Sequence, residues 1–353
     1  MRSETNASRR SAHSVASRHR AESSATPVSV VGAGIAGTWQ ALLFAKAGHP
    51  VTVHERGTPE LAQSTSVRAG GMLAPWCEQE SAEPVITRLG ARALDLWREH
   101  VPGASFNGSL VVAHPRDRAD FDRFARLTER HQRVDGERIA ALEPALAGRF
   151  RDALFFPDEG HVEPRRVLPE LHRQLVANGV AIRFGSEAKP EDLDGIVIDC
   201  RGLAAREAGA IELRGVKGET IVVETSEISL SRPVRLMHPR WPLYLVPRAD
   251  NRIMIGATSI ETEDEGLSVR SALELLSAAY AVHPAFAEAR IVEFGTGLRP
   301  AFPDNLPRIS VEDTRIAVNG LYRHGFLIAP ALAEMTVAYV SRGAIDKEVM
   351  ECN

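Results

Sequence analysis

Cysteine is scarce in this sequence of 353 residues, where it occurs only at Cys77, Cys200 and Cys352. Their spacing fits neither a disulfide framework nor a metal site, so we expect no metal ion and a reducing compartment, the cytoplasm. Apolar runs all fall far short of the roughly 20 residues that cross a membrane as a helix. A net charge of −4 at pH 7 provides no basic surface for a nucleic acid. These absences indicate a globular protein without a membrane or nucleic-acid partner.

The first 26 residues also lack large apolar side chains, and they are rich in serine, alanine and arginine. Without an apolar segment they do not have the pattern of a secretory signal. Their composition shares features with organelle transit peptides, but it is also that of a disordered extension, which we favour for residues 1–26. Over the whole chain, 44% hydrophobic and 25% charged residues are typical of a folded globular protein.

Residues 27–56 have the pattern of one complete dinucleotide-binding unit. A short apolar strand runs into Gly32, Gly34 and Gly37, which form the motif G-x-G-x-x-G. A helical pattern and a second strand follow, and Glu55 closes that strand 18 residues after Gly37. The glycines permit a tight turn, close approach of a pyrophosphate and close helix packing, while the helix N-terminus attracts phosphates. The acid can accept hydrogen bonds from ribose hydroxyl groups, so the unit predicts a dinucleotide cofactor.

An ordinary βαβ unit, whose glycines only turn the chain, is one alternative for residues 27–56. It is disfavoured, because three correctly spaced glycines and the acid would then have to occur together by chance. The acid in place of a basic residue argues against a 2′-phosphate and hence against NADP. It does not distinguish NAD from FAD, and an NAD-dependent dehydrogenase would be a colourless protein.

After this unit the sequence departs from a simple nicotinamide dehydrogenase. Residues 57–75 form a loop of small polar residues and glycine where another helix and strand would follow. Segments of α/β pattern at both ends enclose a middle with antiparallel strand patterns, which predicts an α/β protein (α+β overall) with two interleaved domains. We expect helices over residues 83–100, 117–132, 163–179 and 268–281 and from about 329, and strands over 153–156, 180–184, 195–199, 220–224, 243–247, 252–257, 291–296 and 316–318.

A series of motifs gives the chain a wider resemblance. They are VVGAGIAG at 30–37, RAGGMLAP at 68–75, HVEPRRVL at 161–168, VKGE at 216–219, YLVPR at 244–248, IGAT at 255–258, GLRP with PDNLP at 297–307 and YRHGFLIAP at 322–330. The glycine-rich motif alone occurs in many flavoproteins, whereas the last two motifs in this order are much more specific. From about residue 27 to residue 340 the chain resembles the D-amino-acid-oxidase-like FAD-dependent amine oxidoreductases, and within them the glycine oxidases of thiamine biosynthesis.

The resemblance implies FAD as the cofactor and a Rossmann-like FAD-binding domain interleaved with a smaller substrate domain, whose antiparallel sheet covers the flavin. The expected FAD-binding domain spans residues 27–80, 150–215 and 296–345, and the substrate domain spans 81–149 and 216–295. Many relatives attach FAD through a cysteine near the C-terminal flavin loop. No cysteine lies between Cys200 and Cys352, so we expect non-covalent FAD.

Carried over residue by residue, the resemblance assigns the cofactor contacts to a few segments. The glycine-rich turn faces the pyrophosphate, the acid binds the adenosine ribose, the following loop lines the FAD, and residues 321–327 wrap the isoalloxazine ring. Between Ala188 and Gly195 the chain is shorter than the usual pattern, in which a hairpin precedes the next strand. The expected cofactor-binding residues are Gly32, Gly34, Ile35, Gly37, Glu55, Arg56, Thr65, Ser66, Gly70, Gly71, Met72, Ala188, Gly202, Leu321, Tyr322, Arg323, His324, Gly325, Phe326 and Leu327.

The same resemblance implies that Arg299 binds the substrate carboxylate, since a guanidinium pairs with a carboxylate through two parallel hydrogen bonds. A structural salt bridge would be the default in this arginine-rich chain, and the GLRP context favours substrate binding instead. Tyr244 is expected to close over the substrate, although a tyrosine in a strand is as often part of the core. Arg323 is a further candidate for substrate contact. Residues 76–78 fit either an entrance to the site or core packing.

The implied activity is oxidation of glycine by hydride transfer from Cα to flavin N5, with dioxygen reoxidising the flavin to give hydrogen peroxide. The imine of glycine is the precursor needed for the thiazole ring of thiamine. Two alternatives stay open. One is an oxidase or dehydrogenase of another small amine, such as sarcosine or a D-amino acid. The other is a non-catalytic flavin-binding module that supports a partner protein. The resemblance is also compatible with a homo-oligomer.

Overall fold

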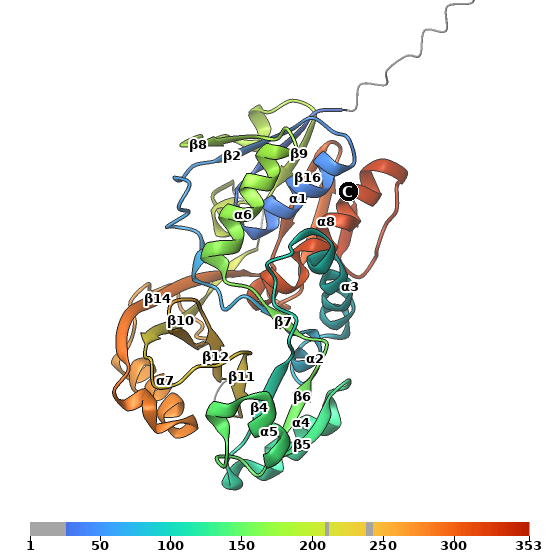
Figure 1. The fold of residues 1–353 in the computed structure, drawn as a ribbon. Helices are drawn as coiled ribbons and strands as arrows, with labels where there is room; N and C mark the ends of the chain where they lie inside the picture. The colour runs from blue at the N-terminus through green and yellow to red at the C-terminus, as the bar shows by residue number, and fades with distance from the viewer. Residues whose placement is uncertain (1–25, 209–211, 238–242, 353) are drawn as a thin grey trace, which may run out of the picture.

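The computed structural model describes residues 26–208, 212–237 and 243–352. Two large sheets lie one above the other in Figure 1. The first has the strand order β17–β15–β16–β9–β1–β2–β8, and its neighbours are parallel except for β15 and β16. Its strands are β1 (Val28–Val31), β2 (Val51–Glu55), β8 (Ala181–Phe184), β9 (Ile196–Asp199), β15 (Arg308–Glu312), β16 (Arg315–Asn319) and β17 (Met350–Cys352). The apolar strand β9 lies in the middle, where parallel strands are buried on both faces.

Helices pack on this parallel sheet and on one another. They are α1 (Ile35–Lys46), α3 (Pro84–His100), α6 (Pro164–Ala177) and α8 (Gly325–Arg342). α1 contacts α6 and α8, and α3 packs on α8. Trp39 of α1 is fully buried and meets Trp97 of α3 edge-on, with ring centroids 5.0 Å apart. α1 and α8 begin side by side. A Cβ on Gly325, the first residue of α8, would lie 3.5 Å from Ile35, the first residue of α1.

The second sheet has the order β14–β10–β13–β12–β11–β4–β6–β5 and is antiparallel except where β11 meets β4. Its strands are β4 (Ser109–Val112), β5 (Gln132–Asp135), β6 (Asp152–Phe156), β10 (Arg214–Glu224), β11 (Val234–Leu236), β12 (Leu243–Pro247), β13 (Arg252–Gly256) and β14 (Arg290–Ala301). Helix α7 (Val269–Val282) packs against β10, β12 and β13. The long pair β10 and β14 runs toward the first sheet in Figure 1, so the two sheets are joined through it.

Short elements connect the two sheets. β14 contacts the 3-10 helices η1, η5 and η7, which all lie beside the parallel sheet. These three elements are η1 (Thr65–Arg68), η5 (Gly202–Ala208) and η7 (Tyr322–His324). The remaining elements are α2 (Pro75–Glu78), α4 (Arg118–Leu127), α5 (Gly136–Leu142), β3 (Met72–Leu73), β7 (Gly160–His161), η2 (Pro115–Asp117), η3 (Pro144–Leu146), η4 (Pro190–Asp192) and η6 (Pro284–Ala287).

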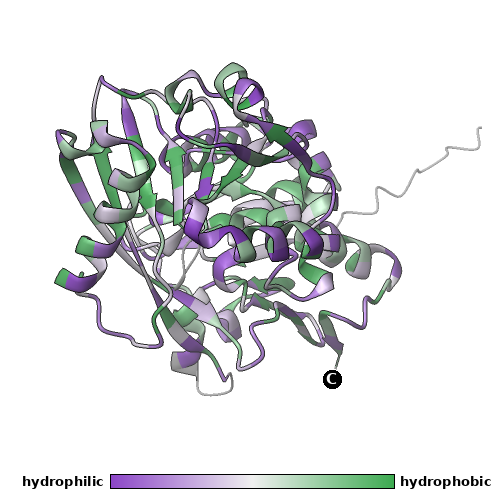
Figure 2. Cartoon of the chain, turned by 90° about the horizontal axis from the view of Figure 1, so that it is seen from below, coloured by the Kyte–Doolittle hydropathy of each residue, from purple (hydrophilic) through white to green (hydrophobic). Residues whose placement is uncertain are grey.

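Each sheet has its own apolar core. The larger core lies between the parallel sheet and its four helices, and the second lies between the antiparallel sheet and α7. Figure 2 shows the strands mostly in green and the hydrophilic residues mainly on outward helix turns and loops. Within the residues that the structure describes, no helix is long and apolar enough to cross a membrane.

Four predicted element boundaries were wrong. β10 begins at Arg214 and not at residue 220, and β14 ends at Ala301 and not at residue 296, because the two strands pair along these extensions. α4 ends at Leu127 and not at residue 132, because Gln132 begins β5 and pairs with Phe155 of β6. α8 begins at Gly325, before the predicted start at about 329. The segment 188–195 contains η4 in place of a hairpin, in keeping with its shortness.

The predicted domain boundaries differ from the sheet membership at β14, β6 and α3. The predicted boundary at residue 296 cuts β14, which pairs with β10 up to Ala301 in the antiparallel sheet. β6 falls in the range predicted for the FAD-binding domain but pairs within the antiparallel sheet, because its partners β4 and β5 belong there. α3 falls in the range predicted for the substrate domain but packs on α8, beside the parallel sheet. The division into two interleaved domains stays a prediction.

Candidate active site

A cavity of about 1140 Å³ lies at the carboxyl ends of β1, β2 and β9 and extends to the face of β10, β12, β13 and β14. The carboxyl ends of parallel strands are where open α/β sheets bind their ligands. One wall of the cavity therefore comes from the parallel sheet and the other from the antiparallel sheet. Seventeen of the predicted cofactor residues line it: Gly32, Gly34, Ile35, Glu55, Arg56, Thr65, Ser66, Gly70, Gly71, Met72, Ala188, Gly202, Leu321, Tyr322, Arg323, Gly325 and Phe326.

The glycine-rich turn forms the end of the cavity nearest the parallel sheet. Gly32 has φ +102°, and a Cβ there would lie 2.7 Å from the carbonyl oxygen of Cys200 on the neighbouring chain segment. A Cβ on Gly37 would lie 1.9 Å from the carbonyl oxygen of Gly32, so Gly37 lets α1 pack against the turn. Gly34 lines the cavity itself, at the N-terminus of α1, where the positive end of the helix dipole suits a pyrophosphate.

Glu55 braces the turn from the end of β2. Its Oε2 accepts a hydrogen bond from the Ala33 amide at 2.8 Å, and its Oε1 accepts one from the Gly57 amide at 2.8 Å. Each carboxylate oxygen can accept a second hydrogen bond. Glu55 therefore holds two loops in place and keeps acceptor capacity for the hydroxyl groups of a ribose.

The loop between β2 and β3 connects the cofactor end of the cavity to β14. The Ser66 hydroxyl accepts a hydrogen bond from the Ile35 amide at 3.1 Å, at the first turn of α1. The Thr65 hydroxyl donates to the Leu298 carbonyl oxygen at 2.9 Å, one residue before Arg299. The same loop thus touches the pyrophosphate cradle and the strand that carries the predicted carboxylate-binding residue.

Three predicted cofactor residues lie beside the cavity and not on its wall. Gly37 packs α1 onto the turn, as described above. His324 is buried next to Glu78, with Nδ1 3.8 Å from Oε2, and Leu327 belongs to the core under α8. Burial lowers the pKa of His324 to about 4, so its imidazole is neutral at physiological pH. The roles of these residues toward a cofactor stay predictions.

Arg299 on β14 presents an unneutralised guanidinium to the cavity. Its Nη1 donates to the carbonyl oxygens of Thr258 at 3.0 Å and Lys217 at 3.4 Å. No carboxylate of the described residues lies within ion-pair distance of it. Burial, with the charge of Arg323 as the second cause, lowers the pKa of Arg299 to about 10, which still leaves it charged at neutral pH. A buried charge that lacks a counter-ion favours binding of an anion.

Gly218 explains how the Arg299 side chain reaches this position. A Cβ on Gly218 would lie 2.1 Å from Arg299 Nη2 and 2.3 Å from its Cζ. The guanidinium therefore lies directly across the backbone of β10, where any side chain would collide with it. The VKGE motif at 216–219 thus makes room for Arg299.

Tyr244, Arg323 and Glu78 form a second polar group in the same cavity. The Arg323 Nη2 donates to Glu78 Oε2 at 2.8 Å, and the Tyr244 hydroxyl donates to Glu78 Oε1 at 3.2 Å. Burial alone would raise the pKa of Glu78, but the charges of Arg323, His324 and Arg235 bring it down to about 2. The charge of Glu78 in turn raises the pKa of Arg323. Glu78 is therefore ionised and compensates the charge of Arg323.

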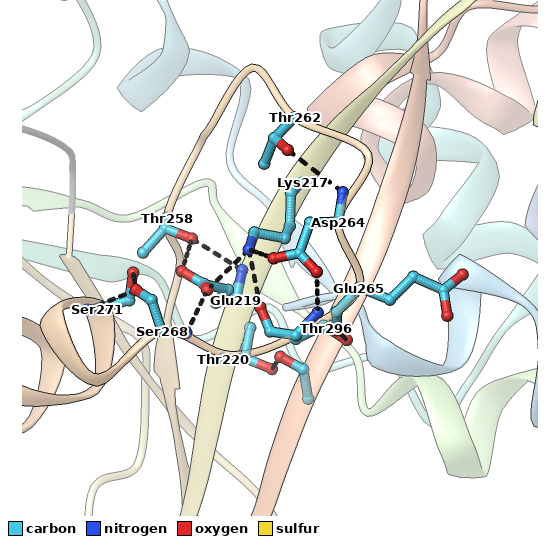
Figure 3. A network of polar contacts seen from close by, with 12 residues as sticks. Lys217, Glu219, Thr220, Thr258, Thr262, Asp264, Glu265, Ser268, Ser271 and Thr296 are labelled. Atoms are coloured by element: carbon cyan, nitrogen blue, oxygen red, sulfur yellow. Dashed lines mark hydrogen bonds and ion pairs between the residues drawn. The ribbon is translucent and has the colours of Figure 1, made fainter.

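A third network holds the loop between β13 and α7 against the cavity (Figure 3). Lys217 Nζ lies 3.3 Å from both Glu219 Oε1 and Asp264 Oδ2 and donates to the Gly266 carbonyl oxygen at 2.8 Å. Glu219 Oε2 accepts a hydrogen bond from the Thr258 hydroxyl at 2.9 Å. The Thr258 carbonyl oxygen also accepts a hydrogen bond from Arg299, so this network holds in place a residue that orients the guanidinium. Lys217 lines the cavity, but its charge is already compensated.

The cavity fits a flavin dinucleotide. The turn at its parallel-sheet end has room for a pyrophosphate because its glycines lack side chains. Glu55 lies next to this turn, where the ribose of a dinucleotide would bind. The guanidinium of Arg299 lies at the other end of the cavity, on the antiparallel sheet. This combination defines a class of protein, the flavin-dependent oxidoreductases.

The chain belongs to a known family of this class. Residues 27–339 match the family described as FAD dependent oxidoreductase, and FAD is the cofactor of the chain. Non-covalent attachment of FAD stays a prediction.

Curated relatives and solved structures agree with this assignment. The chain is 52% identical over 307 residues to the "Putative thiamine biosynthesis oxidoreductase ThiO" of Rhizobium etli, covering 86% of this chain and 93% of the relative. It is 26% identical over 355 residues to the "Glycine oxidase" of Geobacillus kaustophilus, covering 89% and 93% of the two chains. The crystal structure of glycine oxidase from Bacillus cereus has a TM-score of 0.78 at 20% identity, over 91% of this chain and 98% of that chain, which shows the shared fold.

Sequence reasoning did not single out Glu78 or Lys217 for the site. Glu78 follows the expected flavin loop, but its neighbours Trp76 and Cys77 are as apolar as core residues, so the segment fitted both an entrance and the core. Lys217 is one of four lysines in the chain and stands in the VKGE motif, which was the one signal available. Neither spacing nor periodicity brings residue 78 next to residue 323.

Proposed function

We propose that this chain oxidises glycine to its imine, passes the electrons to dioxygen with formation of hydrogen peroxide, and supplies the imine for the thiazole ring of thiamine. The observation that carries the proposal is the unpaired guanidinium of Arg299 in a cavity shared with the flavin cradle. The printed names of the curated relatives, thiamine biosynthesis oxidoreductase and glycine oxidase, support the substrate and the pathway. The cytoplasm and a homo-oligomeric assembly belong to the same proposal.

Arg299 would take the carboxylate of glycine through its free N–H groups and so fix the orientation of Cα. Bound FAD supplies a hydride acceptor at N5. The reaction then depends mainly on holding Cα over that atom, because effective concentration and alignment account for much of such a rate. Tyr244 would limit the space available to the substrate, since it lies at the cavity wall on β12.

The protonation states of the neighbouring groups fit a substrate that binds with a neutral amine. Glu78, with a pKa of about 2, is a poor proton acceptor and is already engaged by Arg323 and Tyr244. The pKa of Tyr244 is raised by burial, so its hydroxyl group stays protonated. These residues therefore orient the substrate, and we assign none of them the role of a base.

A substitution of Arg299 tests the proposal at the residue that carries it. We expect Arg299→Lys to raise KM for glycine by about 100-fold, because a lysine cannot reproduce the two parallel hydrogen bonds and loss of such a contact costs about 2–5 kcal/mol. Glyoxylate and hydrogen peroxide should form in equal amounts in the wild-type reaction. Arg173→Gln, at an exposed arginine on α6, is the control and should leave KM unchanged. An R299K variant with wild-type KM, or a wild-type enzyme that is inert toward glycine, would exclude this assignment.

A further inference from the structure

Among the arginines that line the cavity, Arg299 and Arg323 are close enough for their charges to interact, but their surroundings differ. Arg299 and Arg323 both line the cavity, and the charge of Arg323 contributes to the lowered pKa of Arg299. Arg299 donates only to backbone carbonyl oxygens among the described residues. Arg323 forms an ion pair with Glu78 at 2.8 Å. Of these two guanidinium groups, only that of Arg299 lacks a carboxylate partner among the described residues.

Glu78 is held in place, so it cannot easily swing away from Arg323. It is the last residue of the short helix α2, whose first N–H groups are bound by the buried carboxylate of Glu159: the Trp76 and Cys77 amides donate to Glu159 Oε1 at 3.0 and 2.8 Å. At the other end, Arg235 Nη1 donates to the Cys77 carbonyl oxygen at 2.8 Å. The Tyr244 hydroxyl fixes the second oxygen of Glu78.

We propose that Glu78 is a specificity-determining residue that restricts the site to amines with a single carboxylate, by masking Arg323. The inference rests on the proposed function in taking Arg299 as the carboxylate-binding residue. A substrate with a second anionic group would meet the negative charge of Glu78, because Arg323 is already paired with that carboxylate. Without the Glu78 charge, Arg323 becomes a second anion-binding guanidinium next to Arg299. The same cavity would then accept dianionic amines.

The test compares two five-carbon acids that differ only in a second carboxylate, pentanoate and glutarate. Their binding to the FAD-loaded protein is followed by the perturbation of the flavin absorption spectrum, which requires no turnover. In Glu78→Gln we expect the ratio of the Kd of pentanoate to that of glutarate to rise by about tenfold or more, the effect of roughly one charge-assisted hydrogen bond. Glu83→Gln removes the same charge from an exposed side chain close to α2 and should leave the ratio unchanged.

The double variant E78Q/R323Q separates masking from a general change in charge. If Arg323 is the group that Glu78 masks, the gain for glutarate disappears when Arg323 is also removed. An unchanged ratio in E78Q, or a gain that persists in the double variant, would overturn the proposal.

A second variant keeps the test decisive if E78Q does not retain FAD. Arg323→Gln leaves the Glu78 charge without its partner in the cavity, so the Kd of pentanoate should rise by about tenfold through repulsion of its carboxylate. A Kd equal to that of the wild type would contradict masking. These measurements detect binding alone. They can therefore contradict masking by Glu78 while glycine oxidation is confirmed, or support masking while glycine is not oxidised.

Discussion

At the scale of single residues, the site depends on which charges are compensated. Lys217 and Arg323 lie on the same cavity as Arg299, but each has a carboxylate partner, Glu219 and Glu78 respectively. Arg299 differs because its hydrogen bonds go to neutral carbonyl oxygens, which orient the guanidinium without cancelling its charge. Its charge therefore has no carboxylate partner among the described residues, which is why we propose it as the site for the substrate carboxylate.

Substitution of Gly218 tests the position of this guanidinium without changing any charge. In Gly218→Ala the new methyl group would occupy the place of Arg299 Nη2, and the flexible end of the arginine must move. We expect KM for glycine to rise by about tenfold or more, while FAD content and thermal stability change little, because the displaced atoms are the far end of a side chain.

Gly103→Ala is the matched control, since a Cβ there meets no atom within 4 Å. It should leave KM unchanged. A G218A enzyme with wild-type KM would show that the guanidinium is not required where the structure places it.

At the scale of elements, α2 is a four-residue helix that owes its position to side chains from elsewhere. Such a short helix is not stable by itself, because the first turn of a helix is costly to form. Glu159 binds the amide groups at its N-terminal end and also accepts a hydrogen bond from the Ser109 hydroxyl on β4. The carboxylate thereby ties α2, and with it Glu78, to the antiparallel sheet.

The titration of Glu159 predicts a dependence of stability on pH. Burial raises the pKa of Glu159 to about 7, above the value of about 4.3 expected in the unfolded chain. Between these values the folded protein holds a proton that the unfolded chain releases, so the contribution of Glu159 to stability falls as pH rises and levels off above pH 7. Relative to Glu159→Gln, which cannot titrate, the unfolding free energy of the wild type should fall by on the order of 2 kcal/mol between pH 5 and pH 8.

Chemical denaturation of both proteins across this pH range measures the difference. Parallel curves for the wild type and E159Q would mean that Glu159 keeps one protonation state throughout.

At the scale of the whole molecule, the cavity that fits the cofactor lies where the two sheets meet. The wall of the cavity comes from both of them, and the Thr65–Leu298 hydrogen bond is one of the direct links across it. A ligand that fills this cavity stabilises the folded state, because it binds that state and not the unfolded chain.

Added FAD should therefore raise the thermal stability of protein stripped of its cofactor. At a free FAD concentration of 100 times Kd we expect a gain of about 2.7 kcal/mol in unfolding free energy, seen as a higher Tm. Gly34→Val should lose this gain, since a Cβ there would already lie 3.1 Å from Ser66 Oγ. G103A again serves as the control. A Tm of G34V that still rises fully with FAD would remove the glycine-rich turn from the cofactor site.

The sequence predicts the cofactor end of this molecule better than the substrate end. Gly32, Gly37 and Glu55 belong to a local pattern, in which strand, turn and helix follow one another within a few residues, so spacing alone places them. Glu78 and Arg323 are 245 residues apart and meet only because two sheets built from interleaved segments face each other. The same interleaving explains why the predicted domain boundary at residue 150 placed β6 with the wrong sheet. Nothing in the local sequence indicates to which sheet β6 belongs.

The central claim is that glycine reduces the flavin of this protein. Its most direct test is anaerobic addition of glycine to the FAD-loaded protein while the visible spectrum is recorded. We predict loss of the oxidised flavin absorption, followed by return of the colour and formation of hydrogen peroxide when air is admitted. A yellow protein whose spectrum glycine does not bleach would contradict the claim and move the substrate to another amine.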